Sequence, residues 1–366
     1  MSIQIRKLSS WKTIAAVAIV AIMSIQVQAQ EISLTSSGPI AFGPDGLLLV
    51  SDPKAAVIYA IETGDTEGTA DGVTVELNDV RTKIASMMGA KSDEVRINDL
   101  AVNPINGHPY LSVTRGSGEK EISTILMIDP KTSEISEFEF AGKASTKAEL
   151  PNPAENKKTR RGNQRMNAIT DMAFVDGQVY VAGLSNEEFA SNLRAIAYPF
   201  KESNNGCSIE IYHGAHGQYE TRSPIRTFAA MTIDEEVNLL AAYTCTPLVR
   251  IPVGQLKPES KVKGTTIAEL GNRNRPLDMV VYKKDNKNFA LMANSSRGVM
   301  KIDLATAGSQ SEITQRVGRG ETAGVPYETI KDLTGVMQLD GLSATHGVVL
   351  VRNEDGKEDL KTIALP

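Results

Sequence analysis

The chain has 366 residues, a net charge of −5 and a hydrophobic share of 41%, which is the composition of a folded protein. Its acidic balance argues against a nucleic-acid partner. No Cys-x-x-Cys-His sequence is present, so covalently attached c-type haem is excluded. The single tryptophan, Trp11, lies in an N-terminal segment that we expect to be removed, and this excludes a tryptophan-derived quinone cofactor.

That N-terminal segment has the features of a secretory signal peptide. Three basic residues precede the apolar run Thr13–Ile25, and a Val-Gln-Ala sequence follows and ends at Ala29. The run is short for a permanent membrane span, and no second long apolar run follows it. We therefore expect residues 1–29 to be a signal peptide and residues 30–366 to be one domain, periplasmic or secreted, with no membrane span.

The mature chain opens with a unit of two short apolar strands around a turn, "GPIAFGPDGLLLVSD", followed by a third strand, "AVIYAI". The same order of strand, turn, strand, polar loop and strand returns further along the chain. Clear copies begin at 98, 170 and 277, and weaker copies cover 225–253 and 335–365. Three consecutive strands of this kind are the body of a propeller blade.

The spacing of the units tests this interpretation. The residues just before each first strand lie between 51 and 72 residues apart, and they are Pro39, Asp99, Asp171, Thr227, Asp278 and Gly335. Six such units use up the mature chain, so the pattern predicts an all-β fold, a six-bladed β-propeller. A seven-bladed ring, made by splitting the 99–171 interval, is the alternative. We expect "EISLTSS", residues 31–37, to supply the outer strand that closes the last blade.

Two segments interrupt the repeat. Residues 79–95 place Val80, Ile84, Met87 and Met88 near a 3.6-residue period, which predicts a short helix that packs on the blades. Residues 148–167 form an insertion with a basic run at 157–165. We interpret this run as a solvated loop, and an anionic partner is the alternative.

The sequence "AFGPDGLLLVSD" followed by "VIYAI" resembles the blades of the gluconolactonase-like and NHL-repeat six-bladed propellers. The resemblance implies the fold over most of the mature chain. For the calcium-dependent lactonases of that class it also implies a metal ligand, a Glu just before the Gly-Pro of the first blade. Ser37 stands at that position here, so the metal site of the family is altered in this chain.

Polar residues at the starts of first strands and after second strands are expected to meet on one face, around the mouth of the central channel. From these positions we select the candidate ligand-binding residues Asp99, Asp171, Asp278, Arg115, Asn294 and Arg297. The three aspartates would either bind a hard cation such as calcium or raise one another's pKa until one serves as a general acid or base. The alternative is that each Asp caps a turn or accepts backbone N–H groups of the neighbouring blade.

Two further pairs of residues carry metal or redox chemistry. His213 and His216 stand two residues apart with Glu220 close behind, which indicates a weaker candidate metal site whose third ligand the spacing does not supply. Cys207 and Cys245 are the only cysteines. In an exported chain we expect them to form a disulfide, and two separate thiols are the alternative.

No Gly-x-Ser-x-Gly, Walker or dinucleotide-binding sequence is present, so those chemistries are set aside. The sequence favours an exported monomer whose channel-mouth face binds a small molecule or a protein partner. The alternative is a calcium-dependent, lactonase-like hydrolase that uses the channel aspartates. Fold alone does not choose between them.

Overall fold

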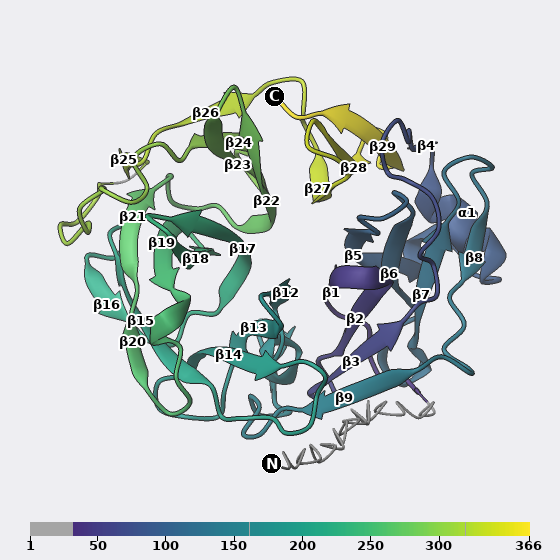
Figure 1. The fold of residues 1–366 in the computed structure, drawn as a ribbon, viewed down its shortest axis with the longest axis horizontal. Coiled ribbons are helices and arrows are strands. Elements are labelled where there is room, and N and C mark those ends of the chain that lie inside the picture. The colour runs from purple at the N-terminus through teal and green to yellow at the C-terminus, as the bar shows by residue number, and fades with distance from the viewer. Residues whose placement is uncertain (1–31, 161, 319) are drawn as a thin grey trace, which may run out of the picture.

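Six β-sheets stand around a central axis in the computed structural model, which describes residues 32–366 except 161 and 319 (Figure 1). The predicted six-bladed propeller is confirmed, and the seven-bladed alternative is wrong. The predicted signal peptide lies outside the described residues. No helix in the described part of the chain combines the length and the apolar character needed to cross a membrane.

The first three blades follow the expected strand order, each starting from an inner strand. Blade 1 consists of β1 (Ile40–Phe42), β2 (Leu47–Asp52), β3 (Val57–Glu62) and β9 (Ser145–Glu149). Blade 2 consists of β5 (Val95–Val102), β6 (Pro109–Arg115), β7 (Ile122–Ile128) and β8 (Ile135–Glu137). Blade 3 consists of β12 (Asp171–Val175), β13 (Gln178–Leu184), β14 (Ser191–Ala197) and β15 (Cys207–His213), extended by β16 (Gln218–Glu220) and by β20 (Lys261–Lys263), which runs parallel to β15.

The other three blades are built in the same way. Blade 4 consists of β17 (Ile225–Ile233), β18 (Glu236–Tyr243), β19 (Pro247–Pro252), β21 (Thr265–Glu269) and β25 (Ala323–Gly324). Blade 5 consists of β22 (Pro276–Lys284), β23 (Lys287–Asn294), β24 (Gly298–Asp303) and β26 (Tyr327–Ile330). Blade 6 consists of β27 (Val336–Gly341), β28 (His346–Arg352), β29 (Glu358–Ala364) and β4 (Glu76–Leu77). Short 3-10 helices occupy connections at Pro44–Gly46, Ser92–Glu94, Gly118–Lys120, Gln164–Asn167 and Val253–Gln255.

The blades do not follow one another around the ring in chain order. The inner strands lie side by side in the order β1, β5, β27, β22, β17 and β12, and β12 then contacts β1 again (Figure 1). Blade 1 therefore stands between blades 2 and 3, and blade 2 stands next to blade 6. The chain builds blade 2 on one side of blade 1, passes back across blade 1, and then builds blades 3 to 6 in the opposite direction.

This path explains how the ring is closed. On its way from blade 1 to blade 2 the chain leaves β4 on the outer edge of blade 6, where Leu77 pairs with Leu360. On its way back it leaves β9 on the outer edge of blade 1, where Ala148 pairs with Ile58. The expectation for residues 31–37 is therefore wrong: Thr35 and Ser36 instead bond to the carboxylate of Asp52 in blade 1. The long 99–171 interval holds β9 and a hairpin and contains no seventh blade.

The core consists of six apolar clusters, one between each pair of neighbouring blades. Because both faces of a blade are covered, β2 is buried along its whole length, in contrast to the alternation of a sheet with one wet face. Aliphatic residues fill these layers, as the small share of aromatic residues requires. The stacked sheets fix the inner strands, and these strands line the channel.

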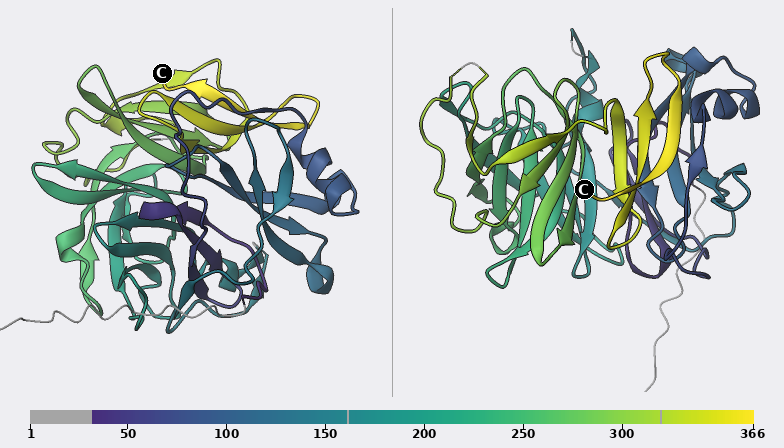
Figure 2. Two further views of the ribbon diagram at one scale, coloured as in Figure 1. Left: turned by 45° about the vertical axis from the view of Figure 1, so that its right-hand side comes forward. Right: turned by 90° about the horizontal axis from the view of Figure 1, so that it is seen from above.

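The predicted helix is present but shorter than expected. α1 (Val80–Met87) packs Val80 and Ile84 into the cluster between blades 2 and 6, while Met87 is 44% exposed, contrary to the periodicity argument. The basic insertion forms the hairpin β10 (Lys158–Thr159) and β11 (Gly162–Asn163) followed by a 3-10 helix. This hairpin projects beyond the blades at the upper edge of the right-hand view in Figure 2.

Candidate functional site

A β-bulge recurs at the start of the inner strands and controls which side chains face the channel. In blades 2, 4, 5 and 6 the pairing register shifts immediately before Asp99, Thr227, Asp278 and Gln338, respectively. A bulge bends its strand and re-aims the next side chain. Asp171 takes the same place in blade 3 as the first residue of β12, without a recorded register shift. The structure thus gathers the three predicted aspartates at one level of the channel.

A fourth carboxylate, Asp340, joins them slightly further along the channel. Sequence reasoning missed it because the last blade was aligned on Gly335, whereas its register places Gln338 where the other blades have Asp or Thr. The sequence "QLDG" was the available signal, since it puts an Asp two residues after that position.

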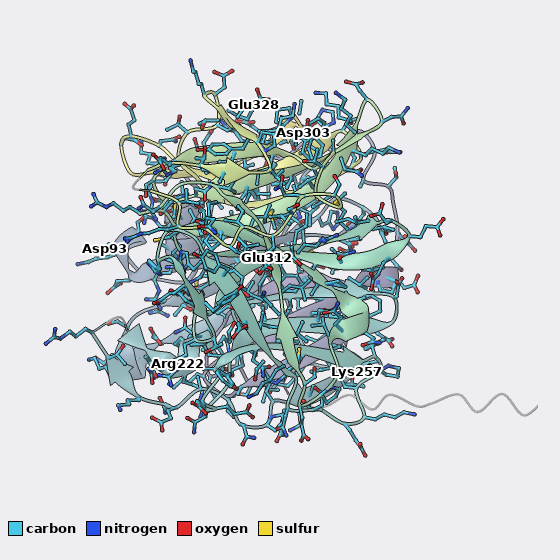
Figure 3. All side chains as sticks on the ribbon, turned by 90° about the vertical axis from the view of Figure 1, so that its left-hand side faces the viewer. Asp93, Arg222, Lys257, Asp303, Glu312 and Glu328 are labelled. Carbon is cyan, nitrogen blue, oxygen red and sulfur yellow. The ribbon has the colours of Figure 1, made fainter. Side chains whose placement is uncertain are left out.

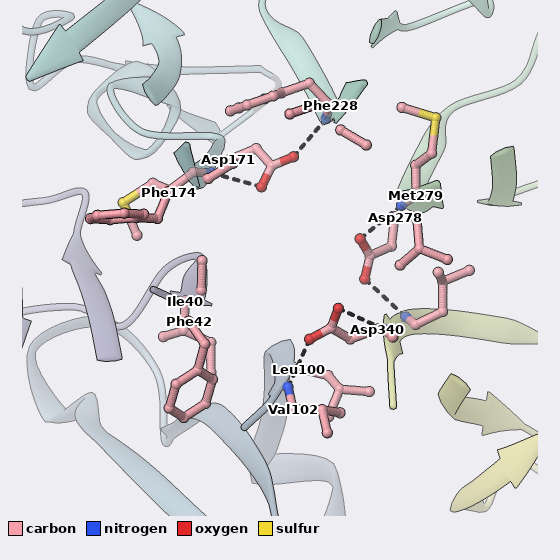
Figure 4. A pocket seen from close by; sticks show the side chains of 18 of the residues that line it. Ile40, Phe42, Leu100, Val102, Asp171, Phe174, Phe228, Asp278, Met279 and Asp340 are labelled. Atoms are coloured by element: carbon pink, nitrogen blue, oxygen red, sulfur yellow. Dashed lines mark hydrogen bonds between the residues drawn. The ribbon is translucent and has the colours of Figure 1, made fainter. Parts of the chain in front are cut away.

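Each aspartate joins its own inner strand to the neighbouring blade, and Figure 4 shows this for Asp171, Asp278 and Asp340. Asp171 accepts the N–H of Met172 at 2.7 Å through one oxygen and the N–H of Phe228 in blade 4 at 2.7 Å through the other. Asp278 accepts the N–H groups of Met279 and Leu339 in the same way, at 2.8 and 2.9 Å.

Two further bonds of this kind complete the pattern. Asp340 accepts the N–H of Val102 in blade 2 at 2.7 Å, and Asp99 accepts the N–H of Ile40 in blade 1 at 2.7 Å. The alternative interpretation of the recurring Asp, acceptance of backbone N–H groups between blades, is thus what the geometry shows. These hydrogen bonds connect blade 3 to blade 4, blade 5 to blade 6, blade 6 to blade 2 and blade 2 to blade 1.

Burial makes ionisation of this ring unfavourable. Desolvation raises the pKa of Asp171 to about 7 and that of Asp340 to about 6, although their N–H bonds oppose the shift. Desolvation also raises the pKa of Asp99 and of Asp278 well above the usual range, and the negative charges of neighbouring channel aspartates add to both shifts. Burial therefore favours the protonated form of these carboxyls, and a protonated carboxyl can donate a hydrogen bond to a ligand.

Above the ring the channel widens into a mouth cavity of about 630 Å³. Its walls come from all six blades and from the hairpin β10–β11 with the 3-10 helix behind it. Three arginines that the sequence analysis did not select line it: Arg222, Arg226 and Arg275. Figure 3, seen edge-on, shows Arg222 on one side of the ring and Lys257 toward the other.

The arginines differ in how they are held. Arg226 bonds to the side chains of Thr244 and Asn167, so the hairpin region is tied to blade 4. Arg222 donates to the carbonyl of Glu188, and Arg275 is exposed. Within the described residues neither Arg222 nor Arg275 has a carboxylate within ion-pair distance. Both remain available to an anion in the cavity.

The other predicted site residues lie elsewhere. Arg115 lines a separate rim cavity with Asp93 and Glu121, and Asn294 is 6% exposed and bonds to Asn274. Arg297 donates to the carbonyl of Asn272. These residues miss the mouth cavity because a loop after the second strand starts one strand spacing, about 4.8 Å, further from the channel axis than the first strand. Residues just before the first strand or at its start reach the channel mouth, and Arg222, Arg226 and Arg275 occupy such positions.

The inner part of the channel is a second cavity of about 380 Å³ below the aspartates. Most of the residues that line it have apolar side chains, among them Phe42, Phe174, Phe228 and Met279 (Figure 4). The four carboxylates line this inner cavity, and Asp99, Asp171 and Asp278 line the mouth cavity as well.

The channel carboxylates were also the candidate calcium ligands. Both oxygens of Asp171, Asp278 and Asp340 already accept backbone N–H groups. Among the described residues, Asp99, Asp171 and Asp278 do not form a group whose ligand oxygens all lie within 4.8 Å of one another. With Ser37 bonded to the carbonyl of Val113 in place of a ligating Glu, this donor set does not fit a calcium ion held by the protein alone.

The expected disulfide is not formed, and both cysteines are free thiols. Cys207 begins β15 and donates to the carbonyl of Leu193, whereas Cys245 lies beside His213 at the other end of that strand. Six residues of strand span about 20 Å, several times the Cα separation that a disulfide permits. The alternative of two separate thiols is what the structure shows.

No protein-family model matches the chain, and no curated protein matches its sequence. Solved structures of similar fold include a PQQ-bound aldose sugar dehydrogenase from Streptomyces coelicolor, 13% identical over 90% of this chain and 94% of that chain, with a TM-score of 0.32. A putative oxidoreductase (glucose dehydrogenase) from Thermus thermophilus is 12% identical over 90% and 97%, with a TM-score of 0.37. An arabinanase from Bacillus subtilis is 12% identical over 73% and 94%, with a TM-score of 0.40. These similarities concern the propeller fold alone.

Proposed function

We propose that this protein is an exported binding protein that holds a small anionic ligand, one bearing a carboxylate or phosphate group, in the mouth cavity. The observation that carries the proposal is the pair Arg222 and Arg275, which line the cavity without a carboxylate partner among the described residues. A guanidinium group presents a planar fork of N–H donors that matches both anions.

The channel aspartates are compatible with a bound anion, although there are four of them. Because burial raises the pKa of Asp171 to about 7, this group is largely protonated under mildly acidic conditions and does not repel an anion. A protonated carboxyl and the amide of Gln338, which donates to the carbonyl of Asn98, place hydrogen-bonding groups at the floor of the cavity. The arginines stand on the side of blades 4 and 5, so the charged end of the ligand is expected there.

The hairpin β10–β11 supports a ligand of limited size. Asn163, Gln164 and Asn167 line the cavity from the side of blades 1 and 3, and Asn167 accepts a hydrogen bond from Arg226. The site is therefore walled on two sides and open along the axis. A cavity of about 630 Å³ suits a metabolite-sized molecule better than a polymer.

A second candidate is a hydrolase of the lactonase type. It is favoured by Asp171, whose carboxyl lies at the boundary of the two cavities and has a pKa raised by burial to about 7, near the value suited to a general acid or base. It requires calcium, for which the chain offers no complete ligand set, so water or substrate oxygens would have to complete the coordination.

Calorimetric titration of the mature protein with small anions distinguishes these functions. Gluconate, glucuronate, citrate and inorganic phosphate serve as probes, and glucose is the neutral control. We expect at least one anion to bind, and Arg275→Ala to weaken it about tenfold or more, while Arg115→Ala in the rim cavity leaves binding unchanged.

A lactone-hydrolysis assay with and without added calcium tests the second candidate. Calcium-dependent turnover that is lost in Asp171→Asn would establish the hydrolase. If no anion binds, or if Arg275→Ala and Arg115→Ala bind equally well, the binding proposal is wrong.

A further inference from the structure

His213, His216 and Cys245 come together on the mouth face, where blade 3 meets blade 4. His213 ends β15, His216 lies in the turn that follows, and Cys245 lies in the turn between β18 and β19. One ring nitrogen of each histidine and the Sγ atom of Cys245 all lie within 4.8 Å of one another. The third ligand that the sequence spacing did not supply therefore comes from the neighbouring blade.

Glu220 determines which ring nitrogen of each histidine carries a proton. One carboxylate oxygen lies 2.9 Å from Nδ1 of His213, and the other bonds to Nδ1 of His216. An ionised carboxylate only accepts hydrogen bonds, so each Nδ1 must carry a proton. In the neutral imidazole this leaves the lone pair on Nε2, which is the arrangement of a metal-binding histidine supported by an outer carboxylate.

The Nε2 atom of His213 is the independent sign of a missing ligand. His213 is 2% exposed, and its Nε2 atom is buried without any hydrogen-bond partner in the structure. A buried polar atom without a partner has lost its hydrogen bonds to water without a replacement, so such an atom is an expected position for a bound group.

The turn that carries Cys245 is unusual for its sequence. Cys245 and Thr246 both have positive φ angles, 68° and 58°. Two consecutive residues of this kind normally call for Asn and Gly, and a β-branched Thr is strained there. Turn geometry does not explain a cysteine at this position.

We propose that His213, His216 and Cys245 bind one transition-metal ion of borderline softness, zinc or copper. A thiolate and two imidazoles suit these metals, whereas calcium and magnesium require oxygen ligands. On binding, the Cys245 thiol releases its proton to solvent and becomes a thiolate, which together with the Glu220 carboxylate offsets the charge of the metal.

The geometry requires only a small adjustment. Metal–ligand bonds of about 2.0–2.3 Å in a tetrahedral site separate the ligand atoms by roughly 3.3–3.8 Å, so separations that are at most 4.8 Å must shorten by no more than about 1.5 Å. His216, whose side chain is 49% exposed, is free to make this movement. Its exposure also leaves room for a water or an exchangeable ligand at the fourth position, and the bound ion would join blade 3 to blade 4.

The test is metal binding by the purified mature protein, first stripped with a chelator and kept reduced with a phosphine. Zinc, copper and calcium are titrated separately, and bound metal is measured by mass spectrometry of the dialysed protein. We expect one zinc or copper ion per chain and no calcium at this site. Cobalt as a spectroscopic probe should show a sulfur-to-metal charge-transfer band together with the visible bands of a tetrahedral ion.

Variants assign the ligands and separate binding from folding. Cys245→Ser and His216→Ala should lose the cobalt–sulfur band and the bound metal, respectively, and Glu220→Gln should weaken metal affinity about 10- to 100-fold. Cys207→Ser, and His108→Ala at the hydrogen-bonded pair with Asp65, are the matched controls and should bind normally. Because Cys245 is on a surface turn, circular dichroism should show its Ser variant to be folded. No stoichiometric zinc or copper, or equal binding by Cys245→Ser and Cys207→Ser, would overturn the proposal.

Discussion

Replacing Asp171 by Asn tests whether the channel ring is protonated in the folded protein. The amide has nearly the shape of the carboxyl and does not ionise, but it keeps one acceptor oxygen where Asp171 offers two, so the N–H of either Met172 or Phe228 loses its acceptor. The lost hydrogen bond destabilises the variant at every pH, and only the pH dependence of its difference from wild type reports the ionisation of Asp171.

The magnitude follows from the raised pKa of Asp171, about 7 in the fold against a usual value of 3.8. A group whose pKa is raised by folding contributes stability that is complete below the unfolded-state pKa and is lost as the pH rises through the folded-state pKa. With about 1.4 kcal/mol per pKa unit, linkage gives a loss of roughly 2 kcal/mol from the wild-type free energy of unfolding between pH 5 and pH 7. The Asn variant lacks this contribution.

The assay is urea unfolding, followed by circular dichroism, at pH 5, 6, 7 and 8. We expect the stability of Asp171→Asn relative to wild type to rise by about 2 kcal/mol from pH 5 to pH 7. Asp93→Asn, at an exposed carboxylate outside the channel, is the control and should follow the wild-type profile. Parallel pH profiles for wild type and Asp171→Asn would refute the protonated ring.

Two further predictions concern ring closure and the thiols. Leu77→Ala should lower the free energy of unfolding by about 2–4 kcal/mol, because Leu77 is 2% exposed in the strand that closes blade 6. Leu34→Ala in the N-terminal segment is the control and should lower it less. Urea unfolding that ranks the two variants in reverse would contradict the closure by β4. A thiol reagent should label only Cys245 in the folded, metal-free protein and both cysteines after unfolding, because burial raises the pKa of the Cys207 thiol to about 12. A chain with no reactive thiol before or after unfolding would instead indicate a disulfide.

The repeat was readable from the sequence because it is local. A strand, a tight turn and a second strand are specified by neighbouring residues, such as the Pro-Asp-Gly of the first hairpin. Six copies of this unit use up the mature chain and form one closed ring. The recurring Asp at the start of inner strands was readable for the same reason. A strand start in a propeller blade lies next to the axis whatever the order of the blades.

The candidate site was readable only in part. Asp99, Asp171 and Asp278 were found because they repeat, whereas Arg222 and Arg275 occur in no repeated position and belong to linkers of different length. Arg115 and Arg297 were expected at the mouth because their loops follow second strands on that face, but these loops start too far from the axis to reach the mouth cavity.

The sequence by itself determined the blade and the three aspartates of the channel, since each depends on contacts within one unit of the chain, and it favoured six blades over seven. Only the tertiary structure decided that blades 1 and 2 exchange places, that β4 and β9 close the ring, and that Cys245 stands beside His213 and His216. The physical reason is the range of the contacts. A two-residue edge strand has no local signal, and its place is set by the apolar surface that it covers on a blade formed almost three hundred residues later.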